Sequence, residues 1–434
     1  MADPRTLCRL IGATMDNVVG LKCLRCSSSY ASDHYAEDCP ACHSVAPSNL
    51  VVEYRPLPKL ERTAPSAGTG MWRYDALLPI RSRQAVSLGE GNSPLLTLDR
   101  IGAELGVGRL LAKDETRNPT WSFKDRLASV AISVAKSMGA RVIVSSSTGN
   151  AGAAAAAYAA KAGLPCVILT TTGSAGPLLV QMRAYGATVL AVANKADRWT
   201  LMQHAVRQFG WFPTSPFFGP VVGSNPYGIE GYKTLAYEIA ESLNWQVPDC
   251  CVVPVCYGDA LIGMWRGFED MRALGWTNKV PRLVAAEIYG SLGAALRDGG
   301  DAPPDMPLTH ETVAKSTSAT RSTFQALAAI RASAGGAVVV GNQDIMRWQK
   351  RLAEAEGLYV EPASAGALAA AEQLRARNEI GASETLVALL TASGLKDTAA
   401  TAAAQGELTP IPSDQAAARA LLARINEDAD ARHA

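Results

Sequence analysis

Lys124 is the residue in this chain whose type and position are best suited to covalent chemistry. It lies in the segment 118–125 (NPTWSFKD), and small residues follow it at helical spacing, among them Ala128, Ala131 and Ala135. This pattern predicts a helix that packs on a core and begins near Lys124. The positive end of a helix dipole disfavours an ammonium ion and so favours a nucleophilic amine. A surface lysine at a helix start is the ordinary alternative, so the case for chemistry depends on the rest of the chain.

Two C-x-x-C pairs near the N-terminus have the spacing of a metal site. Twelve residues separate the first pair, Cys23 and Cys26, from the second, Cys39 and Cys42. Two such pairs supply the four-sulfur shell that zinc prefers, with no open position for a substrate. A segment of roughly 25 residues buries too little apolar surface to fold alone, so the metal would provide most of its stability. We therefore expect a structural zinc ribbon over residues 1–48; free or redox-active cysteines are the alternative.

Composition excludes several classes of function. The chain has 434 residues, a net charge of +1, 48% hydrophobic residues and 19% charged residues, which is typical of a globular enzyme. The near-zero charge gives no reason to expect nucleic acid or an acidic membrane surface as a partner. No apolar run is as long as a membrane span or a signal-peptide core. Together with the paired cysteines, these features predict a cytoplasmic protein.

The chain from about residue 87 onward predicts an α/β fold with parallel-rich sheets covered by helices. Short, continuously apolar runs alternate with helical patterns, as expected of strands buried on both faces. The runs are residues 142–144, 166–169, 188–192, 251–255, 283–286 and 386–390, and the helical segments include 151–161, 176–185 and 363–375. We expect residues 49–86 to be a linker or docking arm and 87–434 a two-lobed catalytic domain, with the smaller lobe over roughly 120–225. Ligands of such sheets bind beyond the carboxyl ends of the strands.

Three polar turns follow predicted strands. The first, Ser147-Thr148-Gly149-Asn150-Ala151, opens an alanine-rich helix, and its backbone N–H groups could bind a carboxylate or phosphate. An ordinary helix cap is the alternative. The second turn could receive a phosphate, and the third begins at Thr391. The second turn consists of Cys256, Tyr257, Gly258, Asp259, Ala260 and Leu261.

Several long motifs follow the expected zinc ribbon in a fixed order: LGEGNSPL (88–95), NPTWSFKDR (118–126), STGN (147–150), EGYKT (230–234) and GLKD (394–397). In sequence and order they resemble the threonine synthase group of the tryptophan-synthase-β-like (fold type II) enzymes, which use pyridoxal phosphate. The similarity covers nearly the whole chain. It implies pyridoxal 5'-phosphate as cofactor, a small-molecule amino-acid substrate and a homodimer.

The resemblance also implies roles for individual residues. Lys124 would bind the cofactor through its amine and, once released, act as the base at the substrate Cα. Phe123 would pack near the cofactor ring, Asn150 would bond to the ring hydroxyl, and Thr391 would face the ring nitrogen. The turn 256–261 would hold the cofactor phosphate. The substrate carboxylate would lie against Ser147, Thr148, Gly149 and Ala151.

Four positions depart from the motifs of that family. Trp121 and Leu127 replace glycines, and Ala151 replaces a residue that often carries a hydroxyl group. Asp259 places a carboxylate in the phosphate turn, where two anions within ~5 Å repel by several kcal/mol. Asp259 must therefore point away, bind a cation or be protonated, and the sequence leaves these three possibilities open.

These departures favour β-elimination from a β-hydroxy or otherwise β-substituted amino acid, which yields a 2-oxo acid and ammonia. Trp121, which we place in the substrate site, and Tyr257 suggest an aromatic or apolar substrate side chain. The alternative is threonine synthesis from O-phosphohomoserine and water, which requires a second anion site. A regulator without turnover is disfavoured because the key motif residues are intact. Candidates for the second anion site are Lys233, Arg126, Ser93 and Asn92.

Overall fold

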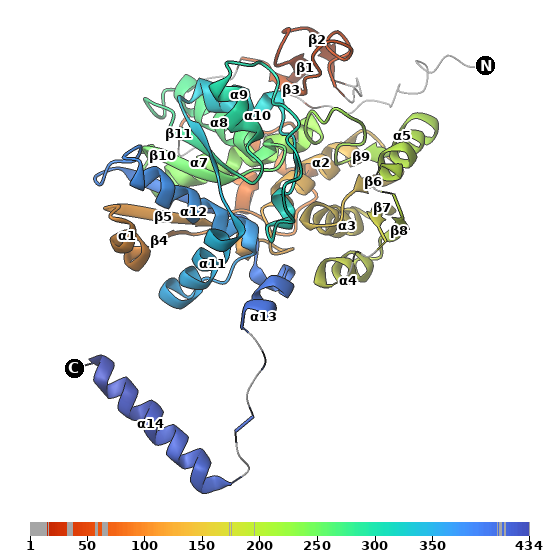
Figure 1. The fold of residues 1–434 in the computed structure, drawn as a ribbon. Coiled ribbons are helices and arrows are strands. Elements are labelled where there is room, and N and C mark those ends of the chain that lie inside the picture. Colours follow the sequence, from red (N-terminus) through yellow and green to blue (C-terminus); the bar gives the residue numbers. More distant parts are fainter. Residues whose placement is uncertain are drawn as a thin grey trace. The chain divides into compact units, whose positions relative to one another are not determined.

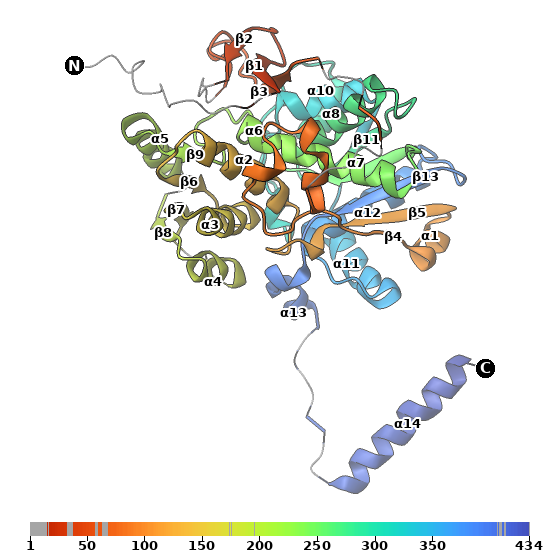
Figure 2. The same ribbon diagram turned by 180° about the vertical axis from the view of Figure 1, so that it is seen from behind.

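The computed structural model describes residues 15, 17–32, 38–56, 60–62, 68–172, 174, 176–194, 196–405, 407, 410–411 and 414–433 (Figure 1). The chain divides into two compact units between Asp397 and Thr398. Two parallel-rich sheets occupy opposite sides of the first unit, as both views show (Figures 1 and 2). The expected α/β class with parallel-rich sheets is confirmed.

The larger sheet has six strands in the order β12-β11-β10-β13-β5-β4. All neighbouring pairs are parallel except β4 and β5. The strands are β4 (Leu95–Thr97), β5 (Arg109–Asp114), β10 (Cys250–Pro254), β11 (Arg282–Glu287), β12 (Gly336–Val339) and β13 (Thr385–Leu390). The central strands β10 and β13 are almost wholly buried, because helices cover the sheet as the continuous apolar pattern predicts.

The smaller sheet is fully parallel and has the order β8-β7-β6-β9. Its strands are β6 (Ile143–Ser146), β7 (Cys166–Thr171), β8 (Thr188–Val192) and β9 (Phe212–Pro213). The helices α2 (Lys124–Ser137), α3 (Asn150–Ala162), α4 (Pro177–Ala184) and α5 (Asp197–Phe209) belong to the same part of the chain. Six alanines in the middle of α3, residues 153–157 and 159, are buried, and their small side chains allow close packing between α3 and α2.

The remaining helices of the first unit cover the larger sheet or connect its strands. They are α1 (Asp99–Leu105), α6 (Pro226–Ile229), α7 (Lys233–Ser242), α8 (Asp259–Ala273), α9 (Ser291–Arg297), α10 (Phe324–Ala332), α11 (Asn342–Glu356) and α12 (Pro362–Ala376). Short 3₁₀ helices are η2 (Gly70–Leu77), η3 (Ser82–Gln84), η4 (Glu115–Arg117), η5 (Glu230–Tyr232), η6 (Lys315–Thr317) and η7 (Gly394–Lys396). Strand β10 leads into α8 and β6 into α3, so both expected strand-to-helix turns are present.

The cysteine-containing N-terminal segment forms a three-stranded antiparallel sheet of β1 (Val18–Cys23), β2 (Ser29–Ala31) and β3 (Leu50–Tyr54). Strand β3 lies beyond residue 48, so this sheet extends into the segment that we expected to be an arm. Further along, η2 docks through buried side chains. Trp72 Nε1 donates to Glu90 Oε1 at 2.7 Å and to Ser129 Oγ at 3.0 Å. The division into ribbon, arm and catalytic domain stays a prediction.

The second unit contains α13 (Ala399–Gln405) and α14 (Gln415–His433). Within the described residues, no helix has the length and apolar character needed to cross a membrane.

Candidate active site

Lys124 is the first residue of α2, as the sequence predicts. Its Nζ lies 4.5 Å from the ring centroid of Phe123 and 5.6 Å from that of Tyr232. These two rings stack on each other, with centroids 5.2 Å apart. The half-buried Lys124 amine has no hydrogen-bond or ion-pair partner among the described residues. An amine beside an aromatic wall and without a counter-ion is suited to bond with an aldehyde.

The loop before Lys124 is bound directly to the loop that carries Thr391. The Phe123 N–H donates to the Thr391 carbonyl at 2.9 Å, and the Ser393 N–H donates to the Trp121 carbonyl at 3.0 Å. A β-bridge joins Ser122 to the residue after Thr391. The structure therefore brings two of the predicted cofactor contacts, from segments about 270 residues apart in the sequence, into one place.

A buried carboxylate, Glu361, connects Thr391 to Asn150. It accepts from Asn150 Nδ2 at 2.9 Å, from Ser316 Oγ at 3.1 Å and from Thr391 Oγ1 at 3.2 Å. Glu361 is 3% exposed, and this burial raises the pKa of its carboxyl although the three donors oppose the rise. The hydroxyl of Ser364 lies 2.7 Å from Thr391 Oγ1. Asn150, expected at the ring hydroxyl, and Thr391, expected at the ring nitrogen, are thus parts of one hydrogen-bond network.

The turn between β6 and α3 presents backbone donors. Ser147 Oγ accepts from the N–H groups of Gly149 and Gly152 at 3.1 and 3.0 Å, so this hydroxyl caps α3. The N–H groups of Thr148, Asn150 and Ala151 have no acceptor within the described part of the chain. Open N–H groups at a helix start favour a carboxylate. The predicted substrate-carboxylate role therefore fits the backbone of this turn, whereas the Ser147 oxygen is already engaged.

The turn between β10 and α8 also presents open backbone N–H groups at the start of a helix. Gly258 adopts φ +82°, and a Cβ there would lie 2.2 Å from Ala326 Cβ, so only glycine fits. The backbone N–H groups of Gly258, Asp259, Ala260 and Leu261 find no acceptor among the described residues. Four such donors at a helix start can bind a phosphate.

The hydrogen bonds of Asp259 explain how a carboxylate is tolerated in a turn that we expect to bind a phosphate. Its carboxylate accepts from Ser224 N at 3.1 Å, from Ser224 Oγ at 2.6 Å and from Gln325 Nε2 at 2.6 Å. Of the three open possibilities, the structure supports the first: the side chain is bound to neighbours of the turn and leaves the N–H groups available.

Buried polar atoms without partners test whether a cofactor fits here. Asn150 Oδ1, Ser122 Oγ and the Tyr232 hydroxyl are buried and have no hydrogen-bond partner. Burying such groups unpaired is costly. All three lie in motifs that support the resemblance, and Tyr232 also stacks against Phe123, so a polar aromatic ligand bound beside Lys124 fits this donor and acceptor set.

Asp125 and Lys396 are two buried titratable residues that contact the loop before Lys124. Asp125 accepts from Thr120 N at 2.8 Å and from Thr120 Oγ1 at 2.6 Å. Burial raises the pKa of Asp125 to about 7, against the opposing effect of those donors and of Lys396. Burial also lowers the pKa of Lys396 to about 8, while Asp125 and Glu361 oppose that change. Lys396 Nζ donates to the Thr120 carbonyl, so the pair holds the loop before Lys124.

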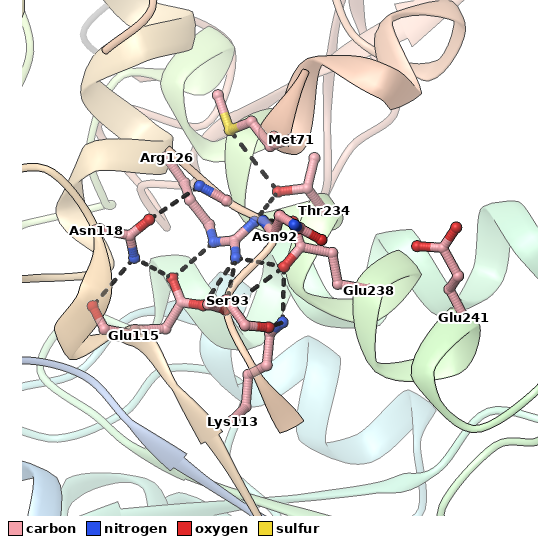
Figure 3. A network of polar contacts seen from close by, with 12 residues as sticks. Met71, Asn92, Ser93, Lys113, Glu115, Asn118, Arg126, Thr234, Glu238 and Glu241 are labelled. Atoms are coloured by element: carbon pink, nitrogen blue, oxygen red, sulfur yellow. Dashed lines mark hydrogen bonds and ion pairs between the residues drawn. The ribbon is translucent and has the colours of Figure 1, made fainter. Parts of the chain in front are cut away.

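The residues that we considered for a second anion site already have partners within the protein. Arg126 is fully buried and binds Glu115 and Glu238, with N–O distances from 2.7 to 2.9 Å (Figure 3). Lys233 Nζ lies 2.8 Å from Glu230 Oε2 and 2.9 Å from an Asp270 oxygen. Ser93 donates to Glu115, and the Asn92 N–H donates to Glu238. The two cations and the Ser93 hydroxyl therefore serve buried networks, which argues against their binding a substrate phosphate, and that role stays a prediction.

Trp121 has an unusual backbone conformation beside the site. Its φ is +64°, and its side chain is 49% exposed. A non-glycine residue in the left-handed region is strained by roughly 1–2 kcal/mol. Its N–H donates to the Asn118 carbonyl at 2.7 Å, which together with the Ser393 contact holds the loop in place. A direct role in substrate binding stays a prediction for Trp121, as it does for Tyr257.

The four paired cysteines converge on one point. Their sulfur atoms all lie within 4.8 Å of one another, with 3.9 Å between Cys23 and Cys42 and 3.6 Å between Cys26 and Cys39. Tetrahedral zinc with bonds of ~2.3 Å separates its sulfur ligands by about 3.8 Å. The geometry is therefore compatible with the predicted zinc site.

Sequence reasoning missed Glu361, Tyr232, Ser316 and Ser364. Glu361 immediately precedes Pro362, the first residue of α12, and a carboxylate at that position reads as an ordinary helix-start residue. Tyr232 lies inside the EGYKT motif that supported the resemblance, yet nothing in the motif shows that its ring meets Phe123. These contacts depend on tertiary packing.

Comparison with known proteins agrees with this geometry. The family model described as "Pyridoxal-phosphate dependent enzyme" matches residues 86–392. A threonine synthase of Methanosarcina acetivorans is 34% identical, covering 87% of this chain and 92% of the relative. A threonine synthase of Methanocaldococcus jannaschii is 32% identical, covering 93% and 99%. The structure of maize serine racemase shares the fold, with a TM-score of 0.59, 22% identity and coverage of 69% and 89%. The chain belongs to the family of pyridoxal-phosphate dependent enzymes.

Proposed function

We propose that this enzyme is a threonine synthase, which converts O-phosphohomoserine and water to threonine and phosphate. The observation that carries the proposal is the similarity to two relatives of that name over 92% and 99% of their lengths. The comparisons thus favour the alternative over β-elimination, which the sequence led us to prefer.

The cofactor, when bound, would supply an electron sink for the negative charge that develops at the substrate Cα. Lys124 would hold the cofactor and, once freed by the substrate amine, take up the Cα proton. The open N–H groups of Thr148, Asn150 and Ala151 would hold the substrate carboxylate. The N–H groups at the start of α8 would hold the cofactor phosphate.

Glu361 would orient the residues at the ring. Because it accepts from both Asn150 and Thr391, it fixes which atoms those side chains can offer to a ligand. Asn150 keeps its unpartnered Oδ1. The stacked rings of Phe123 and Tyr232 would shield the Lys124 amine from water, which keeps it available for proton transfer.

A specific observation keeps β-elimination as a second candidate. A phosphorylated substrate brings a second dianion, but Arg126 and Lys233 are held in buried ion pairs. Removing either from its partners would leave buried carboxylates uncompensated. An amino acid with an uncharged β-substituent requires no such cation, and its elimination releases ammonia and a 2-oxo acid.

The two functions are separated by their products. Purified protein loaded with pyridoxal phosphate is incubated with O-phosphohomoserine, serine, threonine or phenylserine. Equal amounts of inorganic phosphate and threonine from the first substrate support the proposal. A 2-oxo acid and ammonia from one of the others, without phosphate release from phosphohomoserine, would overturn it in favour of elimination. The Lys124→Ala variant is the control for adventitious activity.

A further inference from the structure

The segment that follows the second cysteine pair is held by both pairs. The Cys39 N–H donates to the Ser48 carbonyl at 2.9 Å, and the Leu24 N–H, between Cys23 and Cys26, donates to the Asn49 carbonyl at 3.5 Å. Ser48 and Asn49 are 0% and 3% exposed. The position of Asn49 is therefore set by the turns that carry the four sulfur atoms.

The Asn49 side chain reaches the residues around the phosphate turn. Its Nδ2 donates to the Ser224 carbonyl at 3.1 Å and to Gln325 Oε1 at 3.2 Å. Gln325 Nε2 in turn donates to Asp259 Oδ1 at 2.6 Å. Asp259 is the first residue of α8 and directly follows Gly258. A buried chain of side-chain hydrogen bonds thus leads from the cysteine cluster to the predicted phosphate site.

The packing of Asn49, Gln325 and Asp259 around Gly223 leaves these side chains little freedom to rearrange. Gly223 has φ +126°, and a Cβ there would lie 2.1 Å from Gln325 Nε2 and 2.8 Å from both Asn49 Nδ2 and Asp259 Oδ1. Gln325 and Asp259 are only 1% and 6% exposed. In such a close-packed arrangement, displacement of one side chain shifts the others. Gln325 and Ser224 together hold the Asp259 carboxylate in its present position.

We propose that Asn49 and Gln325 are positioning residues for the phosphate turn, and that metal in the cysteine cluster strengthens cofactor binding through them. The inference rests on the pyridoxal-phosphate part of the proposed function. A small ribbon depends on its metal for order. When the metal is removed, Asn49 loses its fixed position, Gln325 loses a partner, and the Asp259 carboxylate is freed to turn toward the phosphate, which it repels.

The test measures the dissociation constant of pyridoxal phosphate by absorbance titration of the full-length protein. Asn49→Ala and Gln325→Ala should each weaken binding about 10-fold, the equivalent of one lost buried hydrogen bond. Asn17→Ala is the matched control. Asn17 also links the ribbon to the body, through Ala76 and Arg81, but has no contact with the phosphate turn. It should bind the cofactor like the wild type.

The second part of the test removes the metal from the cysteine cluster. Chelation should weaken cofactor binding about 10-fold in the wild type but by less than 2-fold in Gln325→Ala, because the connection is already broken there. Zinc content is measured for every variant. Gln325→Ala touches no cysteine turn, so weakened binding with a full complement of zinc supports the inference even if Asn49→Ala loses its metal.

Three results would overturn it: Gln325→Ala that binds like Asn17→Ala, equal effects of chelation on wild type and Gln325→Ala, or no effect of chelation on the wild type. None of these outcomes involves the substrate. A protein that binds pyridoxal phosphate as described but makes no threonine would refute the proposed function alone.

Discussion

Replacing Arg126 by methionine should destabilise the protein by about 3–5 kcal/mol at pH 7, because it breaks a buried ion network. In the wild type, Arg126 and Lys113 balance Glu115 and Glu238, and all four side chains are at most 1% exposed (Figure 3). Lys113 Nζ lies 2.6 Å from Glu238 Oε2, so one carboxylate keeps a cationic partner in the variant. Glu115 keeps only the neutral donors Ser93 and Asn118. One buried negative charge is then uncompensated.

The stability difference between wild type and Arg126→Met should also depend on pH, in a direction that the pKa shifts determine. In the wild type, attraction to Arg126 holds the pKa of Glu115 and of Glu238 below its usual value against the opposing effect of burial. Both groups therefore contribute stability above their unfolded pKa and lose it as the pH falls through the folded pKa. In Arg126→Met, burial without the cation raises the pKa of the unpaired carboxyl, so the folded variant takes up a proton. The difference in unfolding free energy between wild type and variant should shrink from pH 7 to pH 5.

Urea unfolding of the cofactor-free protein at both pH values measures this difference. Arg126→Lys is the matched control: it keeps the charge but cannot bridge both carboxylates, and should lose about 1.5–3 kcal/mol. A loss below about 1 kcal/mol in Arg126→Met, or a difference that grows at pH 5, would refute the reasoning. Unchanged stability with a raised KM for O-phosphohomoserine alone would restore Arg126 as a substrate ligand.

Three further outcomes follow from the site. Lys124→Ala should lose turnover and the absorption of lysine-bound cofactor, and borohydride should no longer fix the cofactor to the protein; a retained covalent adduct would contradict the assignment. Glu361→Gln should weaken pyridoxal phosphate binding about 10-fold, because its amide presents a donor to at least one donor of the network; exposed Glu354→Gln serves as control, and equal affinities would contradict this role. Trp121→Gly should be more stable to urea than Trp121→Ala by about 1 kcal/mol, since only alanine keeps the left-handed strain; equal stabilities would argue against that strain.

The fold could be predicted from the sequence where strands are continuously apolar. All six predicted strands are present, with ends that differ by a few residues. Strand β5 (Arg109–Asp114) was missed because it carries Lys113 and Asp114, both buried. Lys113 is tolerated inside the sheet only because Glu238, from a distant helix, compensates its charge. Strand β12 was missed because it is short and half-exposed.

Only the residues of the candidate site that lie in sequence motifs could be predicted. Lys124, Asn150 and Thr391 occur in recognisable sequence contexts. The structure joins Asn150 and Thr391 through one side-chain network, and the backbone next to Lys124 bonds to Thr391. Glu361, the centre of that network, has no motif that reports its partners. Residue spacing along one segment says nothing about which distant side chain will meet it. The homodimer and the cytoplasmic location likewise remain predictions.

The departures from the family motifs also show that local sequence does not reveal contacts with distant residues. Asp259 looks incompatible with a phosphate turn, yet Ser224 and Gln325 bind its carboxylate. Trp121 looks incompatible with a position that favours glycine, yet contacts from Asn118 and Ser393 hold its backbone there. Three of these four partners lie 35 or more residues away in the sequence. A local sequence comparison therefore detects each departure but not its compensation, and counting departures overstates how far the chemistry has changed. For this reason the altered motifs, considered from the sequence alone, favoured β-elimination. In the folded protein, the turn before α8 keeps the open N–H groups that a phosphate requires.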